Sequence, residues 1–104
     1  MLIVTTDHIG GKKLQELGIA KGSTVQSVHF GKDFMNGLKT LVGGELTSYN
    51  EMMANARSIA TQRMEEDAAG MGADAVVCAR YVSAQVAQGA AEIMCYGTAV
   101  RYLD

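Results

Sequence analysis

The sequence of 104 residues contains no proline and no tryptophan, and only 6% of it is aromatic. Without proline, its turns must be built from glycine, of which there are 12, and from Asp, Asn and Ser. No apolar run approaches the roughly 20 residues of a membrane-spanning helix, so we expect no membrane association. Residues 1–11 lack the basic stretch of a secretion signal. We therefore expect a cytoplasmic protein.

An excess of charge of one sign is also missing. The chain has nine basic and eleven acidic residues, and the basic ones are scattered. This distribution gives no electrostatic reason to bind nucleic acid. Two cysteines in a chain without an export signal predict reduced thiols rather than a disulfide framework. A hydrophobic content of 48% at this length predicts one globular domain over residues 1–104.

Alternation of apolar and polar side chains, or a short continuous apolar run, predicts the strands. They are expected over residues 2–5, 24–30, 75–82 and 92–103. Residues 12–19 fit either a strand or a helix, and we prefer an extended or bent segment because the piece is short and ends at Gly18. Turns are expected at residues 7–11 and 21–23, and a loose hairpin connection at 85–89.

Two helices are expected between these strands. The first is short, is capped by Asp33 and ends at Gly43-Gly44. The second starts with a capping box, in which the Ser48 hydroxyl accepts from the amide of Glu51 and the glutamate side chain reaches back. The second helix would run for about 24 residues, or roughly 36 Å. The predicted fold is α+β: a small antiparallel or mixed sheet with one short and one long helix packed on it.

The long helix predicts self-association. Its apolar stripe comprises Tyr49, Met53, Ala56, Ala60, Met64 and Met71. A compact domain of this size has a radius of gyration of about 13 Å, so one subunit can hardly cover such a helix on all its apolar sides. We expect part of it to meet a neighbouring chain. Gly43-Gly44 is interpreted as a hinge rather than a phosphate loop, because no lysine-serine or lysine-threonine pair follows it and no strand precedes it.

Several short segments, in their order and spacing, resemble those of the YbjQ-like family, which is described as a "putative heavy-metal-binding" domain. The resemblance covers almost the whole chain. It rests on residues 2–6, 11–13 and 17–19, Gly22, residues 42–44, Tyr49, and residues 72–77 and 97–100. It implies a small α+β subunit in a ring-shaped homo-oligomer, with a pentamer as the expected form. It implies no established activity.

The strongest candidates for a metal site are the two cysteines. Cys78 and Cys95 lie on the two strands of the predicted hairpin, and His29 could join them from another strand. Two thiolates and an imidazole could hold a soft metal ion such as Zn or Cu(I). The alternative is that both cysteines are small hydrophobic core residues, as free cysteines usually are.

The sequence offers no catalytic residue. Ser48 is better explained as a helix cap than as a nucleophile, and no acid–base pair is identifiable. The leading hypothesis is a non-enzymatic homo-oligomer, a pentamer by the resemblance, that binds a small ligand or metal at its subunit interfaces. The alternatives are a soft-metal protein that uses Cys78 and Cys95, and an enzyme whose site is shared between subunits.

Overall fold

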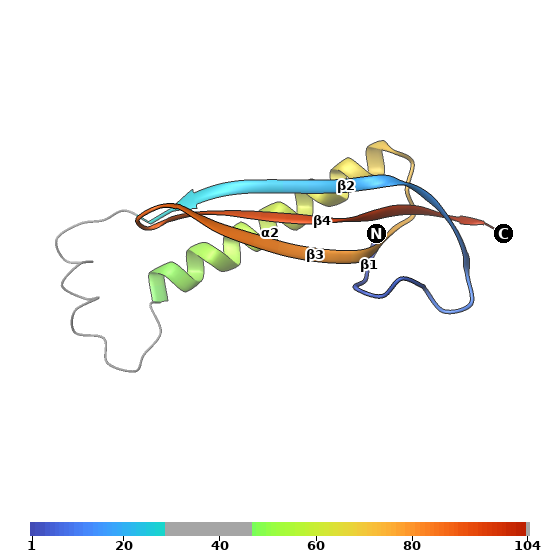
Figure 1. The fold of residues 1–104 in the computed structure, drawn as a ribbon, viewed down its shortest axis with the longest axis horizontal. Coiled ribbons are helices and arrows are strands. Elements are labelled where there is room, and N and C mark those ends of the chain that lie inside the picture. Colours follow the sequence, from blue (N-terminus) through green and yellow to red (C-terminus); the bar gives the residue numbers. More distant parts are fainter. Residues whose placement is uncertain (29–46, 104) are drawn as a thin grey trace.

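A computed structural model of the chain describes residues 1–28 and 47–103. The first predicted helix with its Asp33 cap, the glycine pair Gly43-Gly44, and His29 lie outside the described residues. The described elements are β1 (Leu2–Ile3), β2 (Lys13–Ser27), α2 (Thr47–Gly70), β3 (Ala75–Ala87) and β4 (Ala90–Leu103). They form a mixed four-stranded sheet with α2 packed on it, which confirms the α+β fold class (Figure 1).

The sheet has the strand order β1-β3-β4-β2. The central strand β4 pairs antiparallel with β2 on one side and with β3 on the other, and β1 pairs parallel with β3. The strands are long, and the molecule measures 58 × 25 × 17 Å along its principal axes. The hairpin between β3 and β4 turns at Gln88-Gly89, where Gly89 has a φ of 71°. This turn replaces the loose connection expected over residues 85–89.

The turn predicted at residues 21–23 is wrong. Residues 12–19 are extended, as we preferred, and β2 then runs on through Gly22 to Ser27 without a turn. Instead, Gly22 allows α2 to pack close against β2. A Cβ atom built on Gly22 would lie 2.5 Å from the carbonyl oxygen of Ala60 and even closer to the amide nitrogen of Met64. The glycine therefore lets helix backbone and strand backbone touch directly.

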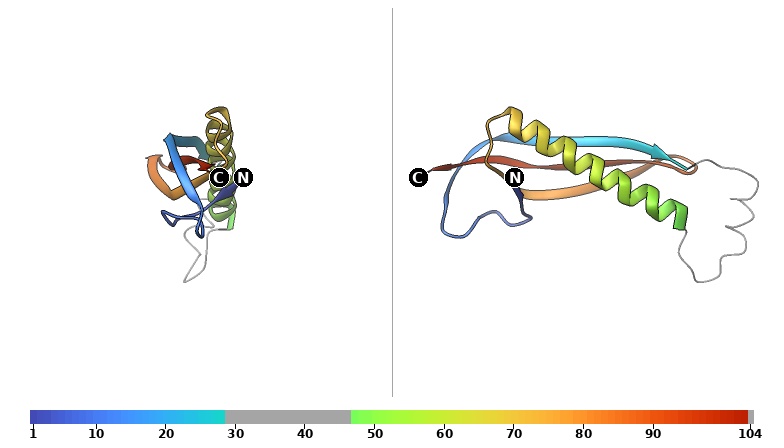
Figure 2. Two further views of the ribbon diagram at one scale, coloured as in Figure 1. Left: turned by 90° about the vertical axis from the view of Figure 1, so that its right-hand side faces the viewer. Right: turned by 180° about the vertical axis from the view of Figure 1, so that it is seen from behind.

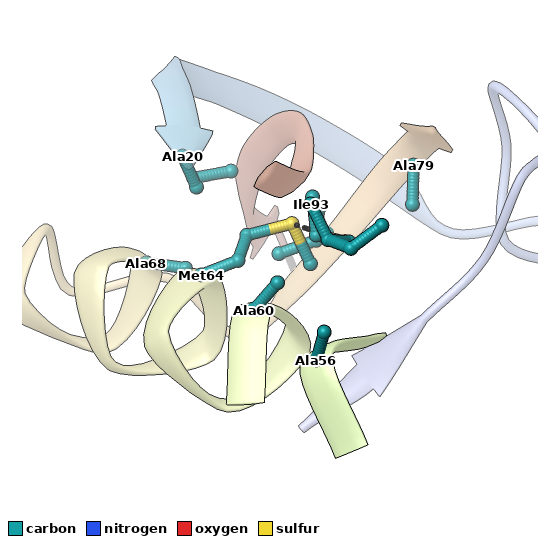
Figure 3. Packing of buried hydrophobic residues seen from close by; sticks show 10 residues of the cluster. Ala20, Ala56, Ala60, Met64, Ala68, Ala79 and Ile93 are labelled. Carbon is teal, nitrogen blue, oxygen red and sulfur yellow. Dashed lines mark hydrogen bonds between the residues drawn. The ribbon is translucent and has the colours of Figure 1, made fainter. Parts of the chain in front are cut away.

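The long helix matches its predicted length and covers one face of the sheet (Figure 2). The side chains that it buries recur every four residues: Met52, Ala56, Ala60, Met64 and Ala68. Met64 projects from α2 toward the sheet among small alanine side chains (Figure 3). The helix ends at Gly70, two residues before the predicted stop Gly72, whose φ is 80°. The amide of Ala73 donates to the carbonyl of Ala68, which is the pairing of a Schellman cap.

The opposite face of the sheet is covered at one end only. There a second apolar cluster of Ala75, Val77 and Val100 packs against residues of the N-terminal segment, including Val4 and Ile9. Toward the β3–β4 hairpin, no described residue covers this face. We call this part the open sheet face. Its exposed apolar side chains are Ile19, Val25, Val82 and Tyr96, with Ile19 exposed to 69%.

Candidate functional site: a groove beside a buried thiol

An open groove runs along the flank of α2 next to β3. It has a volume of about 650 Å³ and is lined by Ala54, Arg57, Ser58, Thr61, Gln62, Glu65 and Tyr81. The first six lie at helical spacing on one side of α2. Among the described residues, Tyr81 is the only one from the sheet that lines the groove, and it is 52% exposed. The groove is therefore a helix flank facing a tyrosine on a strand.

A chain of hydrogen bonds joins the two walls of the groove. The hydroxyl of Thr61 donates to the carbonyl oxygen of Arg57, at 2.7 Å. The hydroxyl oxygens of Thr61 and Tyr81 are 2.6 Å apart. A threonine hydroxyl has a single proton, so Tyr81 must be the donor in the second bond. The lone pairs of the Tyr81 oxygen remain available to accept a hydrogen bond from the groove.

The thiol of Cys95 lies next to these hydroxyl groups, on the helix side of β4. The residue is fully buried, and its thiol contacts the sulfur atom of Met64 at an Sγ–Sδ distance of 3.5 Å. Burial raises the pKa of the Cys95 thiol above its ordinary value of 9.0, and the nearby hydroxyl groups of Tyr81 and Thr61 oppose this shift more weakly. The thiol is therefore protonated at neutral pH.

This raised pKa predicts a loss of stability at alkaline pH. The folded thiol keeps its proton to higher pH than the unfolded thiol does, so its contribution is complete below about pH 9 and falls as the pH rises further. Denaturant unfolding at pH 7.5 and pH 10 should show a larger loss for the parent than for Cys95→Ala. All other groups are the same in both proteins, so their contributions cancel in the comparison. Equal losses would contradict the assignment.

The structure does not bring the two predicted metal ligands together. Cys95 belongs to the cluster beneath α2, whereas Cys78 packs against the cluster of Ala75, Val77 and Val100 on the opposite face of the sheet. Cys78 lies in an irregular step of β3 and has a φ of 55°. Within the described ranges, no three His, Cys, Asp or Glu side chains gather into a possible metal site.

The other predicted site residues were expected to have structural roles. Ser48 and Glu51 lie in the first turn of α2, which begins at Thr47, and their capping interaction stays a prediction. The sequence does not reveal the groove, because the pattern around Tyr81 predicts only a buried strand. The contact between Met64 and Cys95 could have been anticipated, since the predicted helix stripe contains Met64 and the predicted strand face contains Cys95.

Comparison with known proteins identifies the family. Residues 1–103 match a family model described as "Putative heavy-metal-binding". The chain belongs to the YbjQ-like family. The resemblance noted in the sequence is thereby confirmed over nearly the whole chain.

Close relatives of this YbjQ-like chain occur in bacteria and archaea. A UPF0145 protein of Alkaliphilus metalliredigens is 58% identical over 103 residues, which cover 99% of this chain and 100% of the relative. A UPF0145 protein of Methanosarcina acetivorans is 54% identical over 105 residues, covering 100% and 99%. One from Thermus thermophilus is 54% identical over 102 residues, covering 97% and 90%.

A solved structure shares the fold. It is a protein of unknown function from Pediococcus pentosaceus, placed in the DUF74 family, and it superposes with a TM-score of 0.65 over 99% of this chain and 98% of its own. The two sequences are only 11% identical, so the likeness concerns architecture alone. Within residues 1–28 and 47–103, no helix combines the length and apolar character that a membrane crossing requires.

Proposed function

We propose that this YbjQ-like protein is a non-enzymatic, self-assembling subunit. Its copies form a ring, of five by the family resemblance, with a small ligand or metal ion held where subunits meet. The observation that carries the proposal is the edge of β3 between Arg80 and Ala87, with which no strand of the described ranges pairs. Every residue of this segment is exposed, including Val82 at 48% and Val86 at 55%.

The two edges of the sheet differ in whether their outward backbone groups have hydrogen-bond partners among the described residues. On the β2 edge, side chains of α2 occupy the outward backbone groups: Arg63 donates to the carbonyl of Ser23 at 2.7 Å, and Asp67 accepts from the amide of Lys21 at 3.0 Å. On the β3 edge, the N-terminal segment pairs only as far as Ala79. Beyond that residue no described strand pairs with β3. An open, apolar strand edge is a template for another chain.

The exposed surface supports the same proposal. The open sheet face and the β3 edge are contiguous, so one neighbour could cover both. The groove beside Tyr81 borders this surface.

Native mass spectrometry and sedimentation velocity on the purified protein test the proposal. We expect one discrete assembly of identical chains at micromolar concentration, with a mass that is a small multiple of 11.0 kDa. Five copies is the expected number. A protein that remains a folded monomer at these concentrations would contradict self-assembly. An assembly of another size would contradict only the predicted number of subunits.

A further inference from the structure

The lining of the groove beside Tyr81 is almost entirely polar. Among the lining residues, only Ala54 lacks a polar side-chain group. Sites for apolar ligands are lined mostly by hydrophobic and aromatic side chains, so this lining indicates a polar ligand. The groove's volume of about 650 Å³ falls within the usual range for small-molecule sites, roughly 300–1,000 Å³.

The charge left unpaired in the groove is positive. Among residues 1–28 and 47–103, the guanidinium of Arg57 has no ion-pair or hydrogen-bond partner. By contrast, Oε1 of Glu65 already accepts from the nitrogen of Met1, at a distance of 3.2 Å. A guanidinium presents a planar fork of donors that matches the two oxygens of a carboxylate. The charge and its geometry therefore favour a ligand with a carboxylate.

The other groups in the groove require hydrogen-bond donors on the ligand. Tyr81 gives its proton to Thr61, so the Tyr81 oxygen can only accept. The carboxylate of Glu65 can also only accept. The side-chain amide of Gln62 donates to Glu66 at 3.4 Å, which leaves the carbonyl oxygen of Gln62 as an acceptor. These acceptors beside one cation suit a ligand that carries hydroxyl groups as well as a negative charge.

We propose that the groove binds a sugar acid, a chain of hydroxyl-bearing carbons that ends in a carboxylate. Arg57 holds the carboxylate, and Tyr81 and Glu65 accept from the hydroxyl groups. Arg57, Thr61 and Glu65 recur at four-residue spacing, so they share one side of α2 over about 12 Å. An extended six-carbon acid with a hydrogen bond at each end matches this length.

This inference names the ligand of the proposed function. It rests on that function for the further wall that a neighbouring subunit would add to the open groove. Each contact that defines the ligand comes from one chain, so ligand binding and assembly can be measured separately.

Gluconate is the probe, and two compounds with the same number of carbon atoms are its controls. Hexanoate keeps the carboxylate without the hydroxyl groups, and sorbitol keeps hydroxyl groups without the carboxylate. Isothermal titration calorimetry should show saturable binding of gluconate in the millimolar range. Each control should bind at least about tenfold more weakly, which is the effect of losing a hydrogen bond to a charged group.

The chain supplies matched variants for both walls of the groove. Arg57→Gln should weaken gluconate binding by at least about tenfold. Arg101→Gln removes another exposed arginine, on β4, and should bind as the parent does. Tyr81→Phe should reduce the preference for gluconate over hexanoate by about three- to tenfold, the effect of one neutral hydrogen bond. Tyr96→Phe, on the open sheet face, should keep the parent's preference.

The absence of saturable gluconate binding by the parent would overturn the proposal, as would parent-like binding by Arg57→Gln or an equal loss in Arg101→Gln. Hexanoate, sorbitol or inorganic phosphate binding as tightly as gluconate would also overturn it. Thermal unfolding of each variant shows whether a loss of affinity reflects the site or a loss of folding, and the comparison of compounds depends on no variant.

Sedimentation velocity on the same samples separates this test from the test of assembly. An assembled protein that does not bind gluconate would contradict the ligand alone. A monomer that binds gluconate, and loses this binding in Arg57→Gln, would support the ligand and contradict the assembly alone.

Discussion

Gly22→Ala is expected to destabilise the protein by about 3 kcal/mol, the upper end of what overpacking usually costs. The added methyl carbon would lie 2.5 Å from the Ala60 carbonyl oxygen and 2.6 Å from the carbonyl carbon of Arg63. These are backbone atoms, so no side-chain rotation can relieve the contact. Hydrogen bonds on both sides of Gly22, from Arg63 to Ser23 and from Lys21 to Asp67, hold the helix against the strand.

Gly11→Ala is the matched control. A Cβ atom built on Gly11 meets nothing within 4 Å, so the change should stay within about 0.5 kcal/mol of the parent. Urea unfolding, followed by circular dichroism, measures both variants. If Gly22→Ala and Gly11→Ala unfold at the same urea concentration, the direct contact between α2 and β2 is not as the structure has it.

Ser83→Pro should break the assembly while leaving the subunit folded. The amide of Ala79 donates away from β4, to the carbonyl of Val4. Backbone groups alternate along a strand, so the amide of Ser83 also points outward. Proline there removes an outward donor and places its ring on the edge, without touching the ladder to β4. We expect mostly monomer, measured by sedimentation velocity at the concentration where the parent is assembled.

Ser83→Ala is the control, because it removes the same side chain and keeps the amide. It should assemble as the parent does. Circular dichroism of Ser83→Pro must show the parent's helix and sheet content for the comparison to hold. A Ser83→Pro protein that assembles normally would show that subunits meet elsewhere, and the β3 edge would then have no part in the interface.

The local patterns in the sequence predicted the elements well where one face of each is buried. The strict alternation of Ile93, Cys95 and Ala99 against Met94 and Tyr96 placed β4 correctly, since its two faces differ in burial. The long helix was also foreseen, and it ends two residues before the predicted stop at Gly72. By contrast, the sequence around Gly22 predicts a turn that the structure does not contain. Only the helix that lies against it explains the glycine, and that neighbour is 38 residues or more away in the chain.

The candidate site was less accessible to sequence reasoning. The two cysteines are equivalent in sequence, each free and each in an apolar strand. The irregular step at Cys78, where φ is 55°, turns that residue to the face opposite Cys95. A single extra residue in a strand moves the following side chains to the other face of the sheet. The residues next to Cys78 in the sequence give no sign of this irregularity. The pairing of Cys95 with Met64 then depends on where the helix crosses the sheet.

The central place of β4 has a consequence for how the chain folds. Among the described elements β4 is synthesised last, yet both β2 and β3 depend on it for their ladders. The β2–β4 ladder spans Lys13 to Leu103, and such distant pairings make folding slow. Until β4 has been synthesised, β2 and α2 have no complete sheet in which to pack. A truncation that removes β4 should therefore leave no partly folded sheet, only an unfolded chain with an apolar helix exposed to aggregation.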